Sequence, residues 1–247
     1  MNPNNHIISA LAKNSTPIEA INFLSAGQSL NNHVALNEFF KSKKDNLKAI
    51  SFKLRRYDEN VPLKNLNLCQ NLERIVMARW HSKNLEMLSG MPNLKHLELI
   101  DLDAKNDTLV NFFRKLSLKK LEHLSIQHCP DAKEEFFVEL SKLDFPALKN
   151  IGFFQTWQDK CQSRSRNLTD NTLQTLISKC PNLKRILFGH DFDDSNLRVK
   201  TLMDIFEKRN IFMYFGRTHY QFSMEQWFLN HDKNVYDKYQ KLKPIYM

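Results

Sequence analysis

One pattern of apolar and polar positions recurs along most of this chain: three apolar residues at positions 1, 4 and 6 of a six-residue run. Positions 4 and 6 alternate with other residues, as in a short β-strand with one buried face. In the clearest copy, apolar residues over 173–180 precede the run with helical spacing, and Pro181 ends that helix. Each full copy therefore predicts a helix, a turn and a strand. The six copies are Leu47, Ile50, Phe52; Leu72, Ile75, Met77; Leu94, Leu97, Leu99; Leu121, Leu124, Ile126; Leu148, Ile151, Phe153; and Leu183, Ile186, Phe188.

The spacing of these copies predicts a stacked architecture. Their first positions, residues 47, 72, 94, 121, 148 and 183, are 25, 22, 27, 27 and 35 residues apart. A unit of this size cannot bury its apolar side alone, whereas stacked units share one continuous core. We therefore expect an α/β solenoid with a parallel sheet on its concave side and helices on its convex side.

These runs resemble the repeats of the leucine-rich repeat family. The resemblance rests on the L-x-x-L-x-L pattern, the period and the CPNL phrase at Cys180–Leu183, and it extends from Leu47 to Phe188. It is closest to the longer, helix-bearing and cysteine-containing subtype, and it implies a right-handed solenoid. The chain departs from the family eight residues after the first leucine, where Cys129 alone fits the usual Asn or Cys. The asparagine ladder of the family is therefore missing at this position.

The N-terminal residues 1–45 contain no such run. Thr16 and Pro17 are typical of a helix start, and we expect this helix to end at Gly27. A second helix is expected from His33 to Lys43, after a shorter one near the N-terminus. These helices would cover the apolar end of the first repeat, as solenoids require.

The same helices have a second interpretation. The segments PIEAINFLS at 17–25 and VALNEFFKS at 34–42 resemble an F-box, a short helical module that recruits cullin ubiquitin ligases. This resemblance implies the adaptor Skp1 as a partner and a role as a substrate receptor. It remains an alternative to a plain N-terminal cap.

The C-terminal part continues the array and then ends it. IFMYF at Ile211–Phe215 predicts a degenerate seventh strand, so that the repeats occupy residues 46–215. Ser223 and Gln226 form a capping box that begins a helix, and aromatic residues follow. Residues 216–247 are therefore expected to form a C-terminal helical cap.

Composition places the chain inside a cell. Its 42% hydrophobic content predicts a folded protein, and no run of about 18 apolar residues could cross a membrane. The N-terminus lacks the basic and apolar regions of a secretory signal. Four cysteines without C-x-x-C spacing are typical of free thiols in a reducing compartment. They are Cys69, Cys129, Cys161 and Cys180. We expect an intracellular, cytoplasmic protein.

The formal net charge of +9 raises nucleic-acid binding as a further alternative. The basic pairs and triplets are scattered over the chain rather than gathered in one segment, which disfavours this alternative. Abundant Lys and Asn are also typical of an A+T-rich genome, which carries no function.

Candidate chemistry is sparse. His190, Asp191, Asp193 and Asp194 could ligate a metal, but a solvated turn before a helix explains them better. The 5 glycines form no phosphate-binding loop, and no nucleophile motif is present. We therefore expect no enzymatic activity, no metal and no cofactor.

The repeats instead offer a surface for a protein partner. Side chains at positions 3, 5 and 7 of each run point away from the core, onto the concave face. Aromatic residues follow several strands, among them Trp157 in a long polar and basic loop, and Arg and aromatic side chains concentrate binding energy at interfaces. The candidate partner-binding residues are Arg74, Val76, Trp80, His96, Glu98, His123, Asn150, Phe154, Trp157, Arg185 and Leu187.

The sequence therefore predicts a non-catalytic protein–protein interaction module. A short repeat protein with this residue usage also resembles the leucine-rich repeat effectors that intracellular bacteria inject into host cells without a cleavable signal. That resemblance implies a host protein as the partner.

Overall fold

A computed structural model describes most of the repeat array. It covers residues 3–22, 33–53, 63–78, 82–102, 106–127, 134–154, 169–189, 205–216 and 245–246. Several expected features lie outside these ranges, namely Trp80, the Trp157 loop, the turn at His190–Asp194 and the helix after Ser223.

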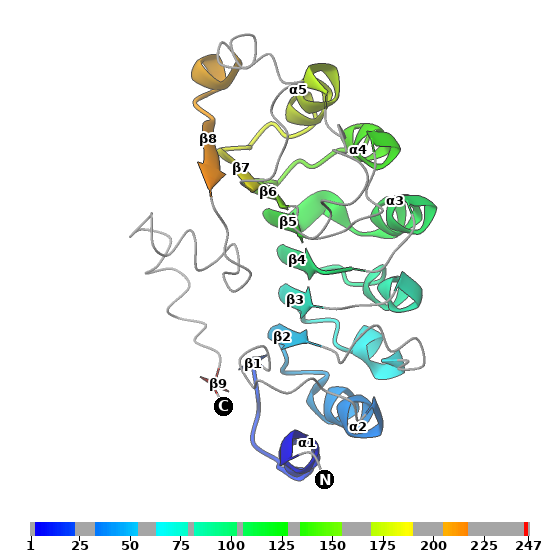
Figure 1. Cartoon of the computed structure of the whole chain (residues 1–247). Helices are drawn as coiled ribbons and strands as arrows, with labels where there is room; N and C mark the ends of the chain where they lie inside the picture. Colours follow the sequence, from blue (N-terminus) through cyan, green and yellow to red (C-terminus); the bar gives the residue numbers. More distant parts are fainter. Residues whose placement is uncertain are drawn as a thin grey trace.

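The described strands form one sheet of nine strands in which all neighbours are parallel. Its order is β8-β7-β6-β5-β4-β3-β2-β1-β9, so β1 to β8 follow chain order and β9 does not. The sheet lines the inner side of an arc, and the helices line the outer side (Figure 1). The strands are β1 Ala20–Asn22, β2 Ala49–Lys53, β3 Arg74–Ala78, β4 His96–Ile100, β5 His123–Gln127, β6 Asn150–Phe154, β7 Arg185–Gly189, β8 Phe212–Gly216 and β9 Ile245–Tyr246.

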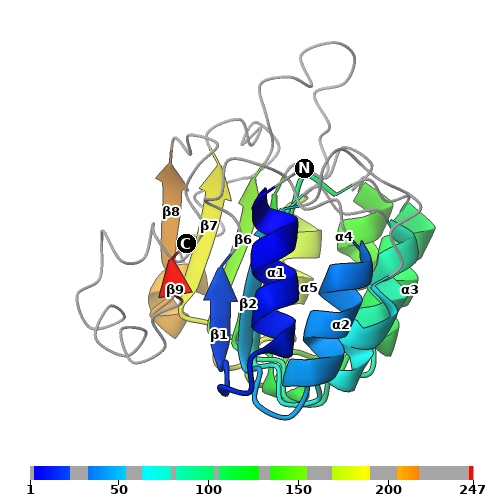
Figure 2. The same ribbon diagram turned by 90° about the horizontal axis from the view of Figure 1, so that it is seen from below.

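Helical segments cover one face of this sheet. Seen from below, the helices lie on one side and the strands on the other (Figure 2). Residues 205–209 add one further helical turn. Together these layers confirm the expected α/β leucine-rich repeat solenoid. The segments are α1 Pro3–Lys13, α2 His33–Lys43, the 3₁₀ helices η1 Lys64–Leu68, η2 Ser82–Leu88 and η3 Leu118–Lys120, and α3 Asn106–Lys115, α4 Glu134–Ser141 and α5 Asp170–Ser178.

The repeat pattern sets the strand register. Position 4 of each run lies opposite position 4 of the next, as in the pairs Ile50–Ile75 and Ile75–Leu97. Because side chains alternate between the two faces of a strand, a slip of one residue would expose the whole apolar set. The apolar runs therefore fix both the register and the buried face.

Paired backbone hydrogen bonds hold successive repeats at the start of each strand. The carbonyl of Glu73 accepts from the amides of Lys95 at 2.8 Å and His96 at 2.9 Å. The same arrangement recurs in the neighbouring repeats. The other carbonyls that accept from two successive amides are those of Glu19, Lys48, Lys95, Glu122 and Lys149.

The core lies between the sheet and the helices. Every described side chain at positions 1, 4 and 6 of the six runs is buried. Aromatic contacts extend this packing, because the ring centroids of Phe113 and Phe136 are 5.8 Å apart and those of Phe137 and Phe153 are 5.1 Å apart. Burial of each such side chain stabilises the fold by about 2 kcal/mol.

The expected helix from Thr16 to Gly27 is wrong. Residues 14–19 are not helical, and Ala20–Asn22 form β1, with Ile21 opposite Ile50. Ile18 and Ile21 are buried and correspond to positions 1 and 4 of a repeat. The array therefore begins one strand earlier than expected, and Pro17 precedes a strand rather than beginning a helix.

The helices α1 and α2 pack against each other at the N-terminal end of the array. α2 has the expected bounds, and its last residue, Lys43, is almost fully buried. The Lys43 ammonium donates to the carbonyls of Asn14 and of Thr16, the latter at 3.1 Å. Lys43 thereby holds the segment between α1 and β1 against α2.

The starts of two other helices show how polar residues stabilise helix ends. In α5, Thr169 is the capping residue, because its hydroxyl accepts from the amide of Thr172 at 3.3 Å. In α3 the helix begins at Asn106, and Asp107 lies within the first turn. An acidic residue there still interacts favourably with the helix dipole.

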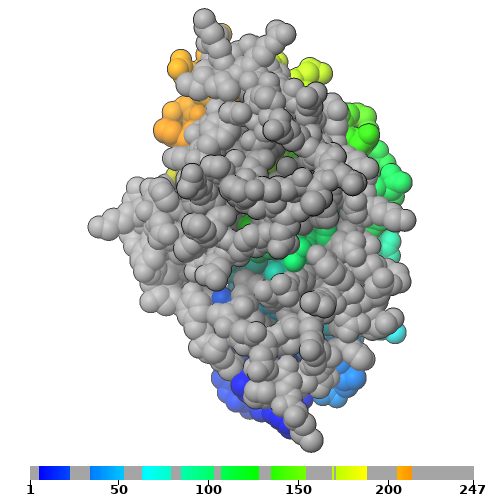
Figure 3. Space-filling view, viewed as in Figure 1, coloured from blue at the N-terminus to red at the C-terminus, as the bar shows by residue number. Residues whose placement is uncertain are grey.

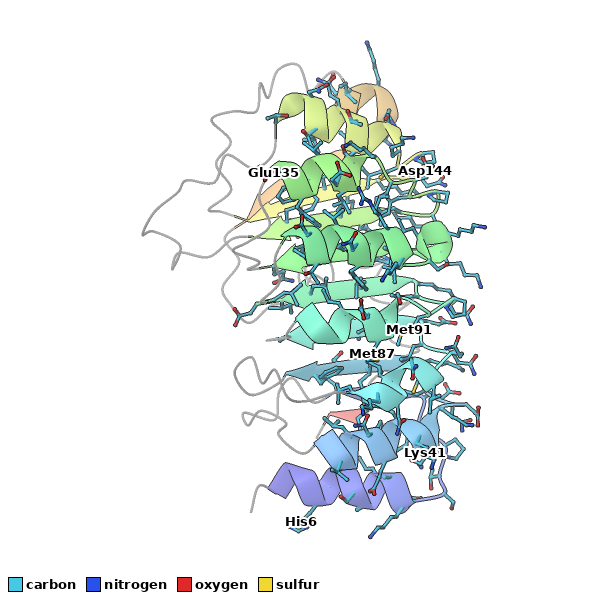
Figure 4. The ribbon with its side chains drawn as sticks, turned by 90° about the vertical axis from the view of Figure 1, so that its right-hand side faces the viewer. His6, Lys41, Met87, Met91, Glu135 and Asp144 are labelled. Carbon is cyan, nitrogen blue, oxygen red and sulfur yellow. The ribbon has the colours of Figure 1, made fainter. Side chains whose placement is uncertain are left out.

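An asparagine ladder is present, but not where the family places it. Asn71, Asn93 and Asn182 each directly precede the first leucine of a run, and each side-chain amide donates to a carbonyl of the preceding repeat. The distances are 2.8, 3.1 and 2.6 Å. These bonds join the turns along the edge of the helix stack, where the labelled Lys41, Met91 and Asp144 also lie (Figure 4).

Replacing Asn93 with Ala should lower the free energy of unfolding by about 1 kcal/mol. The change removes the bond to the Gln70 carbonyl and the acceptor that the Lys120 ammonium uses at 2.7 Å. Urea unfolding followed by circular dichroism measures the effect. Asn67→Ala is the matched control, because Asn67 is exposed within η1. Equal stability of the two variants would contradict the ladder.

Candidate protein-binding face

The side chains at positions 3, 5 and 7 lie on the face of the sheet opposite to the helices. The register aligns each position with the same position in the next strand, as for Arg74 with His96 and His96 with His123. Each position therefore forms a row across the sheet. The position 3 row consists of Ala20, Ala49, Arg74, His96, His123, Asn150, Arg185 and Phe212.

A fully buried carboxylate, that of Glu98, lies beside this row. His96 Nε2 donates to Glu98 Oε1 over 2.6 Å, and Gln127 Nε2 donates to Glu98 Oε2 over 3.4 Å. Gln127 Nε2 also donates to Ser125 Oγ over 3.1 Å. Burying a carboxylate is costly unless donors compensate it. These donors therefore fix the Glu98 side chain in the middle of the face.

The ring of His123 lies between its row neighbours His96 and Asn150. It stacks on the His96 ring with centroids 5.2 Å apart, and Asn150 Nδ2 donates to His123 Nδ1 over 2.8 Å. Accepting this bond suits a neutral ring that carries its proton on Nε2. Burial lowers the pKa of His123 well below its ordinary value of 6.5, and nearby basic groups lower it further, in the order His96, Lys149, Arg185 and Arg74.

This shift makes stability depend on pH. The unfolded chain protonates His123 near pH 6.5, whereas the folded chain keeps the ring neutral to a lower pH. Stability should therefore fall as the pH drops below 6.5, by up to about 1.4 kcal/mol per pH unit from this residue. Urea unfolding at pH 7.0 and 5.5 measures the loss. His123→Asn should reduce it, and an unchanged pH dependence in that variant would contradict the assignment.

The structure places many of the expected partner-binding residues on this face but encloses them. Trp80 and Trp157 lie outside the described residues, and the side chain of Phe154 is not described. Arg185 is half-buried. The side chains in the middle of the face are therefore buried, and a direct role for them in binding a partner stays a prediction. The buried members are Arg74, Val76, His96, Glu98, His123, Asn150 and Leu187.

One exposed residue at the end of the row was not among the expected ones. Phe212 stands opposite Arg185 at position 3 of β8, and 54% of it is exposed. Residues 205–212, drawn in orange, reach the surface of the molecule (Figure 3). An alignment of Ile211–Phe215 with the other repeats would have identified Phe212 as a concave-face residue from the sequence. Phe212 occupies the same position in its repeat as Arg185 does in the preceding one.

A second feature that the sequence analysis missed is a ladder of ion pairs just before the strands. Position 2 alternates in charge along the first repeats, and each acidic residue pairs with the lysine of the next repeat. These pairs are partly exposed, so each contributes little to stability. They are Glu19–Lys48 at 2.9 Å, Glu73–Lys95 at 2.9 Å and Glu122–Lys149 at 2.7 Å.

The described thiols are unsuited to nucleophilic chemistry. Cys69 and Cys180 are free and buried, and burial raises the pKa of each to about 12. Reactive cysteines instead have a lowered pKa and access to solvent. Both residues belong to the core, at the turns that precede Leu72 and Leu183.

A full-length variant with Cys129→Ser and Cys161→Ser keeps only the thiols of Cys69 and Cys180. At pH 8 a thiol reagent should label these two slowly in the folded protein. In denaturant the reagent should label both of them rapidly. The reason is that a pKa of about 12 leaves very little thiolate at that pH. Absorbance of the released reagent group counts the reactive thiols. Rapid labelling under native conditions would show that these residues are not enclosed.

Other classes of site find no support among the described residues. No group of three or more His, Cys, Asp or Glu side chains in these ranges is placed to hold a metal ion. No helix within them is long and apolar enough to cross a membrane.

Comparison with known proteins identifies no family model that matches the chain. Among solved structures, the Rad7 and Elc1 complex of yeast is similar, with 15% sequence identity and a TM-score of 0.44. The match covers 76% of this chain and 61% of that chain, less than two thirds of its length. The α/β solenoid architecture rests on the strand register and the layers of strands and helices, and not on this match.

Proposed function

We propose that this protein is a non-catalytic interaction module that binds a protein partner at the β7–β8 end of the concave face. The supporting observation is Phe212, which is 54% exposed at the end of a row whose middle members are buried. A large aromatic residue exposed at the end of an enclosed polar row is a natural anchor for a partner.

Arg185 supports this choice of position. It lies opposite Phe212 in the register, and its guanidinium can donate several hydrogen bonds to a carboxylate or a carbonyl. An aromatic side chain beside an arginine combines apolar contact area with directional donors, the combination that dominates protein interfaces. The enclosed network around Glu98 then serves to hold the strands that carry this pair.

The alternative functions have less support. The segment expected to be the first helix of an F-box contains β1, so the helical basis for binding Skp1 is weakened. Nucleic-acid binding rests on net charge alone, and three of the lysines that a phosphate could contact, Lys48, Lys95 and Lys149, are paired with glutamates. Injection into a host cell stays a prediction from the sequence resemblance, as does a cytoplasmic location.

The proposal predicts which substitutions weaken the complex. After affinity capture of a partner from a lysate, Phe212→Ala and Arg185→Ala should each lower its affinity at least tenfold, measured by calorimetry on the purified pair. Val34→Ala is the matched control, because Val34 is 56% exposed on α2, away from the concave face.

Circular dichroism should show the same fold for all three variants. Full affinity of both Phe212→Ala and Arg185→Ala would place the partner elsewhere on the molecule. A partner that is lost equally with Val34→Ala would show that the effect is not specific to this face.

A further inference from the structure

The first and the last of the described strands pair at one edge of the sheet. The strand β9 pairs in parallel with β1, with Ile245 opposite Ile21 and Tyr246 opposite Asn22. Among the described strands, this is the one neighbouring pair that does not follow chain order. β9 and the C-terminus accordingly lie beside β1 (Figure 1).

The strand β9 occupies the side of the β1 backbone that faces away from β2. The Glu19 carbonyl accepts from the amides of Lys48 and Ala49, so Glu19 faces β2. Backbone groups alternate in direction along a strand, which turns those of Ala20 and Asn22 toward β9. An edge of this kind is a template for any extended segment that presents matching donors and acceptors.

The resident strand is short and tethered. Only two residues of β9 pair with β1, and three residues of β1 pair with β2, whereas the pairs from β2–β3 to β6–β7 extend over four or five residues. Residues 217–244 link it to β8 at the opposite end of the sheet. These 28 residues can span about 90 Å. Eight strand spacings amount to about 38 Å, so the linker reaches easily.

Because β9 belongs to the same chain as β1, their pairing is intramolecular, and an intramolecular strand can stay paired even when its intrinsic affinity is weak. A foreign segment must therefore make more main-chain bonds than β9 does. It could do so by extending the pairing to Ala20, the residue of β1 that β9 does not pair with.

We propose that the outer edge of β1 is a binding site for an extended segment of a partner protein, which runs parallel to β1 with an aliphatic residue opposite Ile21 and an aromatic one opposite Asn22. The chain's own C-terminus fills this site when the partner is absent. This surface lies at the opposite end of the sheet from Phe212 and is independent of the proposed function.

The test uses a fluorescent peptide of residues 241–247 as the probe and full-length proteins as receptors. Ile245→Asp, or Tyr246→Asp as a second variant, should release the resident strand. The peptide should then bind at least tenfold more tightly than to the unchanged chain, in which the tethered strand competes. Fluorescence polarisation measures the affinity, and amide hydrogen exchange of residues 18–22 reports where the peptide binds.

Two changes at Asn22 test the edge itself. Asn22→Pro in the Ile245→Asp chain removes an amide that faces β9 and should abolish binding, while Asn22→Ala should retain it. Equal peptide affinity for the unchanged and Ile245→Asp chains would overturn the proposal, as would no binding to the Ile245→Asp chain at about 1 mM peptide. A concentration-dependent dimer that disappears in Ile245→Asp would assign the edge to a second copy and overturn the foreign partner.

Discussion

The structure depends on the in-register pairing of short parallel strands, one from each repeat. The strands β2 to β7 each begin where two successive amides donate to a single carbonyl of the preceding repeat, as Lys95 and His96 do to Glu73. This arrangement fixes the position of every later residue in the strand. Because side chains alternate, the same constraint sends positions 4 and 6 into the core and positions 3, 5 and 7 to the concave face.

Rows of like positions follow from this constraint and explain the features of the concave face. Position 2 carries the Glu–Lys ion pairs, and position 3 carries the polar series that includes His96 and His123. The Glu98 carboxylate accepts one bond from His96 in its own strand, β4, and one from Gln127 in the adjacent strand β5, so the second donor depends on the register. A network of this kind is sensitive to slippage, so it adds specificity to the register that the apolar runs set.

The sequence predicted the sheet well where its pattern is local. The six apolar runs and the strand at Ile211–Phe215 are confirmed, because alternation within a few residues determines which side is buried. β1 was missed, since Thr16 and Pro17 also fit a helix start and tertiary pairing with β2 decides the outcome. Enclosure of His123 and exposure of Phe212 depend on neighbours distant in the chain, which no local pattern records.

The middle of the concave face is an enclosed polar network whose members are aligned by the strand register. The protonation of the His123 ring tests this enclosure directly. Its ¹⁵N chemical shifts, followed by NMR from pH 7.5 to 5.5 and assigned with a His123→Asn variant, should keep the values of a neutral imidazole with the proton on Nε2. A titration of this ring near pH 6.5 would show that the face is open to water and would contradict the account.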